Sequence, residues 1–290
     1  MCVKKATTVQ EQIEKLKSRG CSFENENKAA AILERINYYR LTAYFLTFKK
    51  EDGTYIDGTS FETVYKIYEF DKELRKLIFS EIESIEIMLR TKTAYYFSHK
   101  YGPLGYLDEN NFNNRHKTDK FEEKINKAIQ DNKTQPFVKH HIENKGAKFP
   151  LWVSIELFSF GMLSIFYADL LAADKKALSE QITGDSNNHK NLESWLFCIS
   201  HLRNWCAHYS RLYYNKFGTV PATPKSSQFK YNDRLFGYLM AMKNVCPDKE
   251  KWDFEFINNL DNLISKYKDY IDIKHLGFHK DWKKNLMFLN

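Results

Sequence analysis

Glycine and proline are scarce in this chain, with 11 and 6 residues among 290. So few of these residues argue against a fibrous or disordered protein. Extended runs in which apolar and polar residues alternate are also nearly absent, which argues against a β-sheet protein. The 43% of residues that are hydrophobic can form one large core or two modest ones. The sequence therefore predicts a folded, all-α protein.

Cysteine is rare as well. The five cysteines are odd in number, widely scattered and never spaced as a C-x-x-C pair. This pattern argues against a disulfide framework and against a zinc ribbon or knuckle, so we expect a reducing cytoplasm and no bound metal. Residues 1–17 are polar and charged and lack the apolar region of a signal peptide, so secretion is not expected.

No apolar run is suited to crossing a membrane. The longest, residues 151–171, has the length of a membrane span but contains Glu156, Asp169 and several serines, each of which is costly in lipid. We expect a buried core helix there and no membrane contact. The formal net charge of +7 is compatible with a polyanionic partner, although on charge alone a lysine-rich surface is an equally good interpretation.

Apolar residues recur at helical spacing along most of the chain. We expect one long helix or a kinked pair over 61–101, capped by Thr59 with Glu62 and ended by Gly102-Pro103. The expected architecture is a helical bundle over 1–215, in which 104–150 form an insertion or arm with two short helices, and a C-terminal helical extension over 216–290 packed on it. The other expected helices cover about residues 8–19, 25–45, 151–170, 173–182, 189–213, 231–244 and 253–270.

Residues 202–208, Leu-Arg-Asn-Trp-Cys-Ala-His, form the stretch that most suggests chemistry. They place an arginine, an amide and an imidazole on about one and a half turns of the helix expected over 189–213. One face of this helix is apolar and belongs in the core, and the opposite face carries a polar stripe. The apolar face comprises Leu192, Trp195, Leu196, Ile199, Leu202 and Cys206, and the polar stripe comprises His201, Asn204, His208 and Arg211.

Arg203 lies near the edge of the apolar face, about 140° around the helix from His208. A guanidinium there is expensive to bury unless a carboxylate or a phosphate meets it. Glu156, the only charge in the first four turns of the apolar helix over 151–170, is the expected protein partner of Arg203. This pairing is a hypothesis, and a structure in which the two residues lie far apart would disprove it.

The three polar residues of this stretch suit cleavage of RNA by its own 2′-hydroxyl. That reaction needs a base, an acid for the leaving 5′-oxygen, and positive charge near the phosphorane. His208 would handle the protons, Arg203 would bind phosphate, and Asn204 would orient the imidazole or bind phosphate. The alternatives are a solvated histidine on a helix surface and an arginine in a structural ion pair.

Aromatic and basic residues interleave in the chain, as in many binders of single-stranded RNA. Arg211, Tyr213 and Tyr214 are the residues expected to contact RNA, because they follow the motif on the same expected helix, and Arg40 lies in an aromatic-rich stretch. A metal site built from His116, the adjacent His140-His141 and Glu143 is less favoured than ordinary polar surface, because adjacent histidines do not share a helical face.

Several segments together resemble the Abi-like (AbiD/AbiF-type) abortive-infection family of bacterial phage-defence proteins. The order and spacing of these segments make the resemblance more specific than the short motif, and it covers about residues 8–215. The segments are Tyr38–Phe45, Phe70–Arg75, Ile85–Thr91, Pro150–Trp152 with Glu156–Gly161, and Leu202–Asn204 with Ala207-His208 and Arg211-Leu212.

The family is similar to the HEPN superfamily, whose helical bundles include many metal-independent ribonucleases with an R-φ-x-x-x-H motif. The resemblance implies that Arg203 and His208 form the catalytic pair, with Asn204 as the polar residue after the arginine. It also implies chemistry without a cofactor, and products with a 2′,3′-cyclic phosphate or 3′-phosphate and a 5′-hydroxyl. HEPN sites usually combine two motifs, so a symmetric homodimer would supply the second one.

The sequence thus favours a cytoplasmic, toxin-like endoribonuclease that cuts RNA during phage infection. Family analogy implies that a partner inhibits it, either an antitoxin protein or a small regulatory RNA. Two alternatives remain open: a HEPN-like module that binds RNA without cutting it, and a structural or sensor protein in which the motif only forms an ion pair.

Overall fold

The computed structural model describes residues 5–288 and is helical, with isolated β-bridges and no β-sheet in that range. The prediction of an all-α fold is confirmed. Residues 1–4, which include Cys2 and the start of the segment examined for a signal peptide, lie outside the described residues, as do 289–290. No helix in the described part of the chain is long and apolar enough to cross a membrane.

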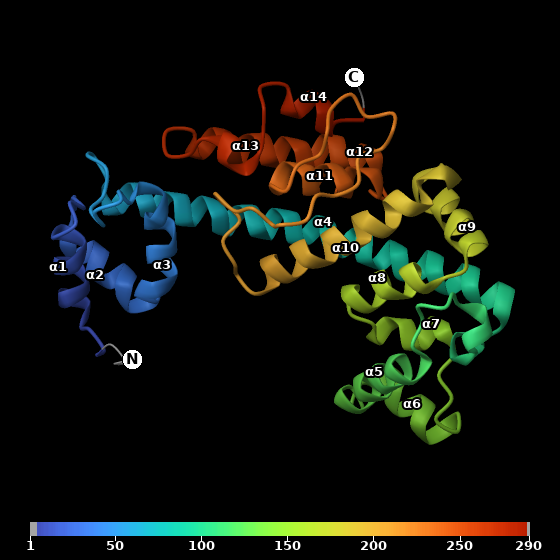
Figure 1. Cartoon of the computed structure of the whole chain (residues 1–290). Helices are drawn as coiled ribbons and strands as arrows, with labels where there is room; N and C mark the ends of the chain where they lie inside the picture. Colours follow the sequence, from blue (N-terminus) through green and yellow to red (C-terminus); the bar gives the residue numbers. More distant parts are fainter. Residues whose placement is uncertain (1–4, 289–290) are drawn as a thin grey trace.

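The long helix α4, Phe61–Tyr101, runs through the middle of the molecule (Figure 1). Its predicted bounds are confirmed, and Gly102 ends it with a φ of 81°. The predicted cap is wrong, because the Oγ of Ser60 accepts the hydrogen bond from the Thr63 amide at 3.1 Å. The Thr59 hydroxyl donates instead to the backbone oxygen of Ile56 at 2.6 Å.

Three short helices gather at the N-terminal end of α4 (Figure 1): α1 (Val9–Lys17), α2 (Glu26–Arg35) and α3 (Tyr38–Phe45). The predicted helix from about residue 25 into residue 45 is therefore two helices. Asn37 begins the second one, because its side-chain oxygen accepts a hydrogen bond from the Tyr39 amide at 2.8 Å.

The opposite end of α4 carries the helices of the middle of the chain (Figure 1). The two short helices predicted between 104 and 150 are present, and the helix predicted over 151–170 is broken. Phe158 adopts an extended backbone, and Ser159 then caps a new helix by accepting from the Met162 amide at 3.2 Å. The helices are α5 (Thr118–Asp131), α6 (Pro136–Asn144), α7 (Leu151–Ser154), α8 (Phe160–Asp169) and α9 (Ala172–Thr183).

Helix α10, His189–Ala207, crosses α4 and packs against α8 and α9. All residues of its predicted apolar face are buried. The C-terminal helices cover α10 and α4, because α11 (Leu235–Asn244) packs on α10 and α13 (Ile257–Tyr267) packs on α4. Between them lie α12 (Lys249–Lys251) and a π-helical turn (Trp252–Phe256), and α14 (Trp282–Leu286) follows.

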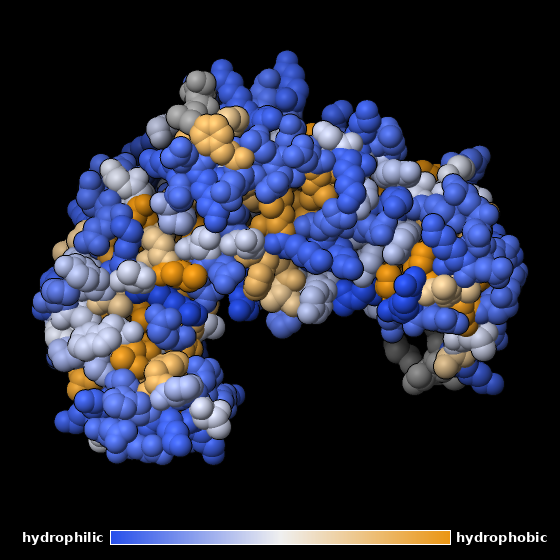
Figure 2. Space-filling view, turned by 180° about the vertical axis from the view of Figure 1, so that it is seen from behind, coloured by the Kyte–Doolittle hydropathy of each residue, from blue (hydrophilic) through white to orange (hydrophobic). Residues whose placement is uncertain are grey.

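The whole molecule has the shape of an arch. Seen from behind, it is hollowed between the end that contains α5 and α6 and the end that contains the N-terminal helices (Figure 2). The C-terminal end of α10 lies on the concave side of α4, between these two ends (Figure 1). The motif of residues 202–208 is therefore carried to the hollow side of the arch.

Candidate functional site at the end of helix α10

Helix α10 ends within the motif. The prediction that it continues to residue 213 is wrong, because the helix ends at Ala207 and His208 is its cap. Tyr209 adopts the left-handed conformation with a φ of 58°. Its amide donates to the backbone oxygen of Cys206 at 3.1 Å, and the Ser210 amide donates to that of Trp205 at 2.9 Å. These two bonds define a Schellman motif, in which glycine usually occupies the position of Tyr209.

A buried carboxylate holds the chain that follows this turn. The Asp71 side chain of α4 is fully buried and accepts hydrogen bonds from the backbone amides of Leu212 and Tyr213, at 3.1 and 2.8 Å. It also accepts from the Tyr44 hydroxyl at 2.7 Å and forms an ion pair with Arg75, one turn further along α4. Burial raises the pKa of Asp71, and Arg75 and these donors oppose that rise.

Three arginines fix the turn itself. Arg75 donates to the backbone oxygen of Ser210 at 3.1 Å, and Arg40 of α3 donates to that of Tyr209 at 2.6 Å. Arg211 reaches in the opposite direction and donates to the backbone oxygen of Ala43. The segment after α10 is thus bound to α3 and α4, which gives Arg40 and Arg211 structural contacts beside the motif.

Two grooves meet at Tyr209. The first, of about 590 Å³, lies between α3 and the turn; it is lined by Asn37, Tyr39, Arg40, Ala43, Tyr44, His208, Tyr209, Ser210 and Arg211. It contains no carboxylate among the described residues. The second, of about 460 Å³, lies between α4 and the end of α10 and is lined by Lys72, Arg75, Lys76, Phe79, Ser80, Glu83, Cys206, Ala207 and Tyr209. We call these the α3 groove and the α4 groove. Basic residues outnumber acidic ones in both.

Arg203 faces α4. Its guanidinium lies 5.7 Å from the centre of the Phe79 ring, and within residues 5–288 its buried Nε has no hydrogen-bond partner. The hypothesis that Glu156 pairs with Arg203 is wrong, because Glu156 lies 3.5 Å from the guanidinium of Arg90. The same arginine donates to the backbone oxygen of Phe158 at the break between α7 and α8. The Nε of Arg203 is therefore a buried donor without a protein partner in the described part of the chain.

The side chains of His201, Asn204 and His208 are exposed. Their contacts differ, because the His201 ring packs against Phe197 with the ring centres 4.3 Å apart, whereas His208 lines the α3 groove. Asn204 contacts His208 through the backbone, where its oxygen accepts from the His208 amide at 2.9 Å. The imidazole of His208 is thus open to a ligand in the groove.

The tyrosines expected to bind RNA are not on the motif helix. Tyr213 is 4% exposed, and its hydroxyl accepts a hydrogen bond from the Asp272 amide at 3.0 Å. Tyr214 packs against His275, with the ring centres 3.8 Å apart. The expectation that both extend the motif along one helix is therefore wrong, and Tyr209, which sequence reasoning did not select, takes the exposed position beside His208.

Cys206 lies within the motif but is not a nucleophile. Its side chain is buried against the core, and burial raises the pKa of the thiol to about 12. A thiolate is the reactive form of cysteine, and at neutral pH the thiol therefore stays protonated. Cys206 is therefore excluded as a reactive group of the motif.

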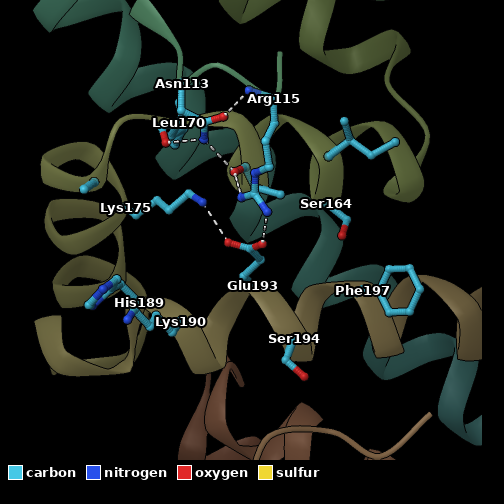
Figure 3. Close-up of a pocket in the computed structure, with 13 residues that line it drawn as sticks. Asn113, Arg115, Ser164, Leu170, Lys175, His189, Lys190, Glu193, Ser194 and Phe197 are labelled. Atoms are coloured by element: carbon cyan, nitrogen blue, oxygen red, sulfur yellow. Dashed lines mark hydrogen bonds and ion pairs between the residues drawn. The ribbon is translucent and has the colours of Figure 1, made fainter. Parts of the chain in front are cut away.

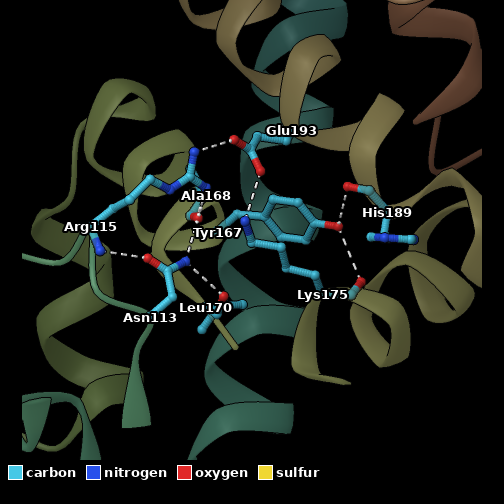
Figure 4. A network of polar contacts seen from close by, with 8 residues as sticks. All are labelled: Asn113, Arg115, Tyr167, Ala168, Leu170, Lys175, His189 and Glu193. Carbon is cyan, nitrogen blue, oxygen red and sulfur yellow. Dashed lines mark hydrogen bonds and ion pairs between the residues drawn. The ribbon is translucent and has the colours of Figure 1, made fainter. Parts of the chain in front are cut away.

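A further depression, of about 700 Å³, lies beside the first turns of α10 (Figure 3). Its wall contains Glu193, which accepts hydrogen bonds from Lys175 at 2.7 Å and from Arg115 at 3.0 Å (Figure 4). Burial raises the pKa of Glu193, but the bonds from Arg115 and Lys175 outweigh it and hold the pKa below its ordinary value. Since Glu193 of α10 binds both Lys175 and Arg115, and Arg115 lies in the polar segment 104–150, we interpret this network as a joint between that segment and α10.

The geometry defines a helical protein that presents an exposed imidazole and a partly buried arginine beside two basic grooves. Residues 31–214, well over half of the chain, match the family described as Abi-like protein. The chain belongs to this family, and membership suggests a role in abortive infection, a bacterial defence against phage. No curated protein and no solved structure matches the chain.

The segments that carried the family resemblance converge in the structure. Tyr44, Asp71, Arg75 and the chain after His208 meet in one buried network. The remaining segments meet at Arg90, which forms ion pairs with Glu86 and Glu156. A charged Asp71–Arg75 pair among apolar residues of α4 is the sequence signal from which the first network could have been found.

Proposed function

We propose that this protein is a HEPN-type endoribonuclease that acts in abortive infection by cutting RNA without a metal cofactor. The observation that carries the proposal is the exposed His208 imidazole in a groove whose described lining residues include no carboxylate, on the same helix end as Arg203, whose buried Nε has no hydrogen-bond partner within residues 5–288. Such a groove favours the polyanionic backbone of RNA over acidic or neutral ligands.

In the proposed reaction the 2′-oxygen of a ribose attacks the adjacent phosphorus, and the bond from phosphorus to the 5′-oxygen breaks. A histidine accepts the proton of the 2′-hydroxyl, and a second group donates a proton to the leaving 5′-oxygen. Arg203 stabilises the charge on the phosphorane. The products are a 2′,3′-cyclic phosphate and a 5′-hydroxyl.

One chain carries one such motif, so we propose that a symmetric homodimer provides the second proton-transfer group. The α10 end lies on the concave side of the arch, so the two copies would meet on that side (Figure 1). An antitoxin protein or a small regulatory RNA would inhibit the enzyme by covering the same surface.

The test is cleavage of an end-labelled, structured RNA by the purified full chain in the presence of EDTA, with mapping of the product ends. We expect the wild type to produce cyclic phosphate ends and His208→Ala to lose cleavage. His140→Ala is the matched control, because His140 is an exposed histidine on α6 and should leave cleavage unchanged. RNA binding by the wild type without cleavage would instead favour a binding module.

That alternative has one observation in its favour. In a single chain the Arg203 guanidinium packs against Phe79 of α4, whereas His208 lines the α3 groove. If the two residues only hold RNA at separate places, Arg203→Ala and His208→Ala will each weaken RNA binding. The wild type and both variants will then cleave no more RNA than a control without protein.

A further inference from the structure

Tyr209 combines two features that rarely occur together. Its backbone has the left-handed conformation that glycine usually supplies at this position of a Schellman motif, and the residue is 67% exposed. A tyrosine there gains little from burial and strains the backbone. Packing within this chain therefore does not explain why an exposed tyrosine occupies this position.

The surroundings hold the backbone of Tyr209 in place. The backbone oxygens of Tyr209 and Ser210 accept hydrogen bonds from Arg40 and Arg75, so the turn is fixed from two helices. The Arg40 guanidinium also lies 6.0 Å from the centre of the Tyr209 ring. A ring on a fixed backbone loses less freedom when a ligand stacks on it than a ring on a mobile loop does, which favours binding.

The ring stands between two basic surfaces. Tyr209 lines both the α3 groove, with Arg40 and Arg211, and the α4 groove, with the exposed Lys72 and Lys76. Glu83 is the carboxylate of the α4 groove. An aromatic ring between two cationic tracks is the arrangement by which proteins bind single-stranded nucleic acid, with bases on the ring and phosphates along the tracks.

We propose that Tyr209 is a stacking platform for one unpaired base of RNA, whose backbone passes from the α4 groove to the α3 groove beside His208. This proposal deepens the proposed function, on which it rests for the identity of the ligand as RNA. A base in a duplex already stacks on its neighbours, so the platform selects single-stranded RNA over double-stranded RNA.

The experiment measures the binding of a fluorescein-labelled single-stranded RNA and of its duplex to the full chain in a His208→Ala background, which prevents cleavage. Tyr209→Ala is expected to weaken single-strand binding by about 5- to 150-fold, the range observed for loss of one base–aromatic stack. Tyr209→Phe keeps the ring and should remain within about twofold. The affinity for duplex RNA should change little in both variants.

Tyr95→Ala is the matched control, because Tyr95 is a tyrosine of α4 with a similar exposed fraction, 66%, outside both grooves. Unchanged single-strand affinity in Tyr209→Ala would overturn the proposal. Equal weakening of single-strand and duplex binding would also overturn it, and would indicate a role in placing the basic residues. Sedimentation could also show that Tyr209→Ala forms a smaller oligomer than the wild type. That result, with RNA affinity per chain unchanged, would assign the ring to a protein interface instead.

Failure of the stacking proposal and failure of the nuclease proposal can be told apart. Wild-type cleavage together with unchanged binding in Tyr209→Ala rejects the platform alone. Loss of single-strand binding in Tyr209→Ala, in a protein whose wild type never cleaves, rejects the nuclease alone.

Discussion

Single residues decide the geometry of the motif. Asp71 accepts hydrogen bonds from residues 141 and 142 positions later in the chain, so one carboxylate on α4 sets the direction of the segment after α10. Local sequence does not reveal these distant donors. For this reason the sequence predicted the apolar face of α10 but placed Arg211, Tyr213 and Tyr214 on a helix that has already ended.

We expect Asp71→Asn to destabilise the protein by about 3–5 kcal/mol, because it leaves the guanidinium of Arg75 buried without its anionic partner. Urea unfolding followed by circular dichroism measures this change in the free energy of unfolding. Glu73→Gln is the control, because Glu73 pairs with Lys266 at the surface and should cost no more than about 1 kcal/mol. Equal effects of the two substitutions would contradict a structural role for the buried pair.

Tyr209→Gly should stabilise the protein by about 1 kcal/mol, because glycine adopts a φ of 58° without steric strain. Tyr209→Ala keeps the strained backbone and should give no such gain. The difference between the two variants therefore isolates the contribution of backbone strain to the free energy of unfolding. The measurement is the midpoint of thermal unfolding for both variants. If alanine raises the midpoint as much as glycine does, removal of the exposed ring rather than the backbone is the cause.

At the scale of elements, the sequence predicted α4 almost to the residue because its apolar spacing is unbroken and Gly102-Pro103 ends it. It missed the break between α7 and α8, where Arg90 of α4 meets the backbone oxygen of Phe158 at 2.7 Å. It also missed the end of α10, which depends on Arg40 and Arg75. Both breaks are held by arginines from other elements, and periodicity within a segment contains no information about them.

The joint between the segment 104–150 and α10 should depend on pH. The folded protein lowers the pKa of Glu193, so the stabilisation from Arg115 and Lys175 is present above the pKa of the unfolded chain and is lost as the pH falls through the lower, folded value. We expect Glu193→Gln to cost no more than about 1 kcal/mol at pH 7, because solvent screens a partly exposed group. The cost of Glu193→Gln should shrink steadily as the pH falls from 7 into the acid range, which unfolding at a series of pH values would show. A cost that persists undiminished at low pH would contradict the ionic origin.

The end of α10, which both grooves adjoin, lies on the hollow side of the arch, and the proposed dimer can be tested at the scale of the whole molecule. Wild-type protein that is unfolded and refolded together with an excess of His208→Ala should lose more cleavage than dilution explains, compared with wild type refolded alone. The loss is expected because most wild-type chains then lie in mixed dimers, which lack the second proton-transfer group. Cleavage that falls only in proportion to the share of wild-type chains would indicate that one chain is sufficient.

The order of synthesis gives the Asp71 network another consequence. The Asp71 carboxylate leaves the ribosome long before the amides of Leu212 and Tyr213, which donate to it in the folded protein. An incomplete chain can therefore form α4 yet lacks the bonds that orient the turn beside His208. The grooves take shape only when translation has passed the motif, so fragments of this protein made by interrupted translation carry no assembled site.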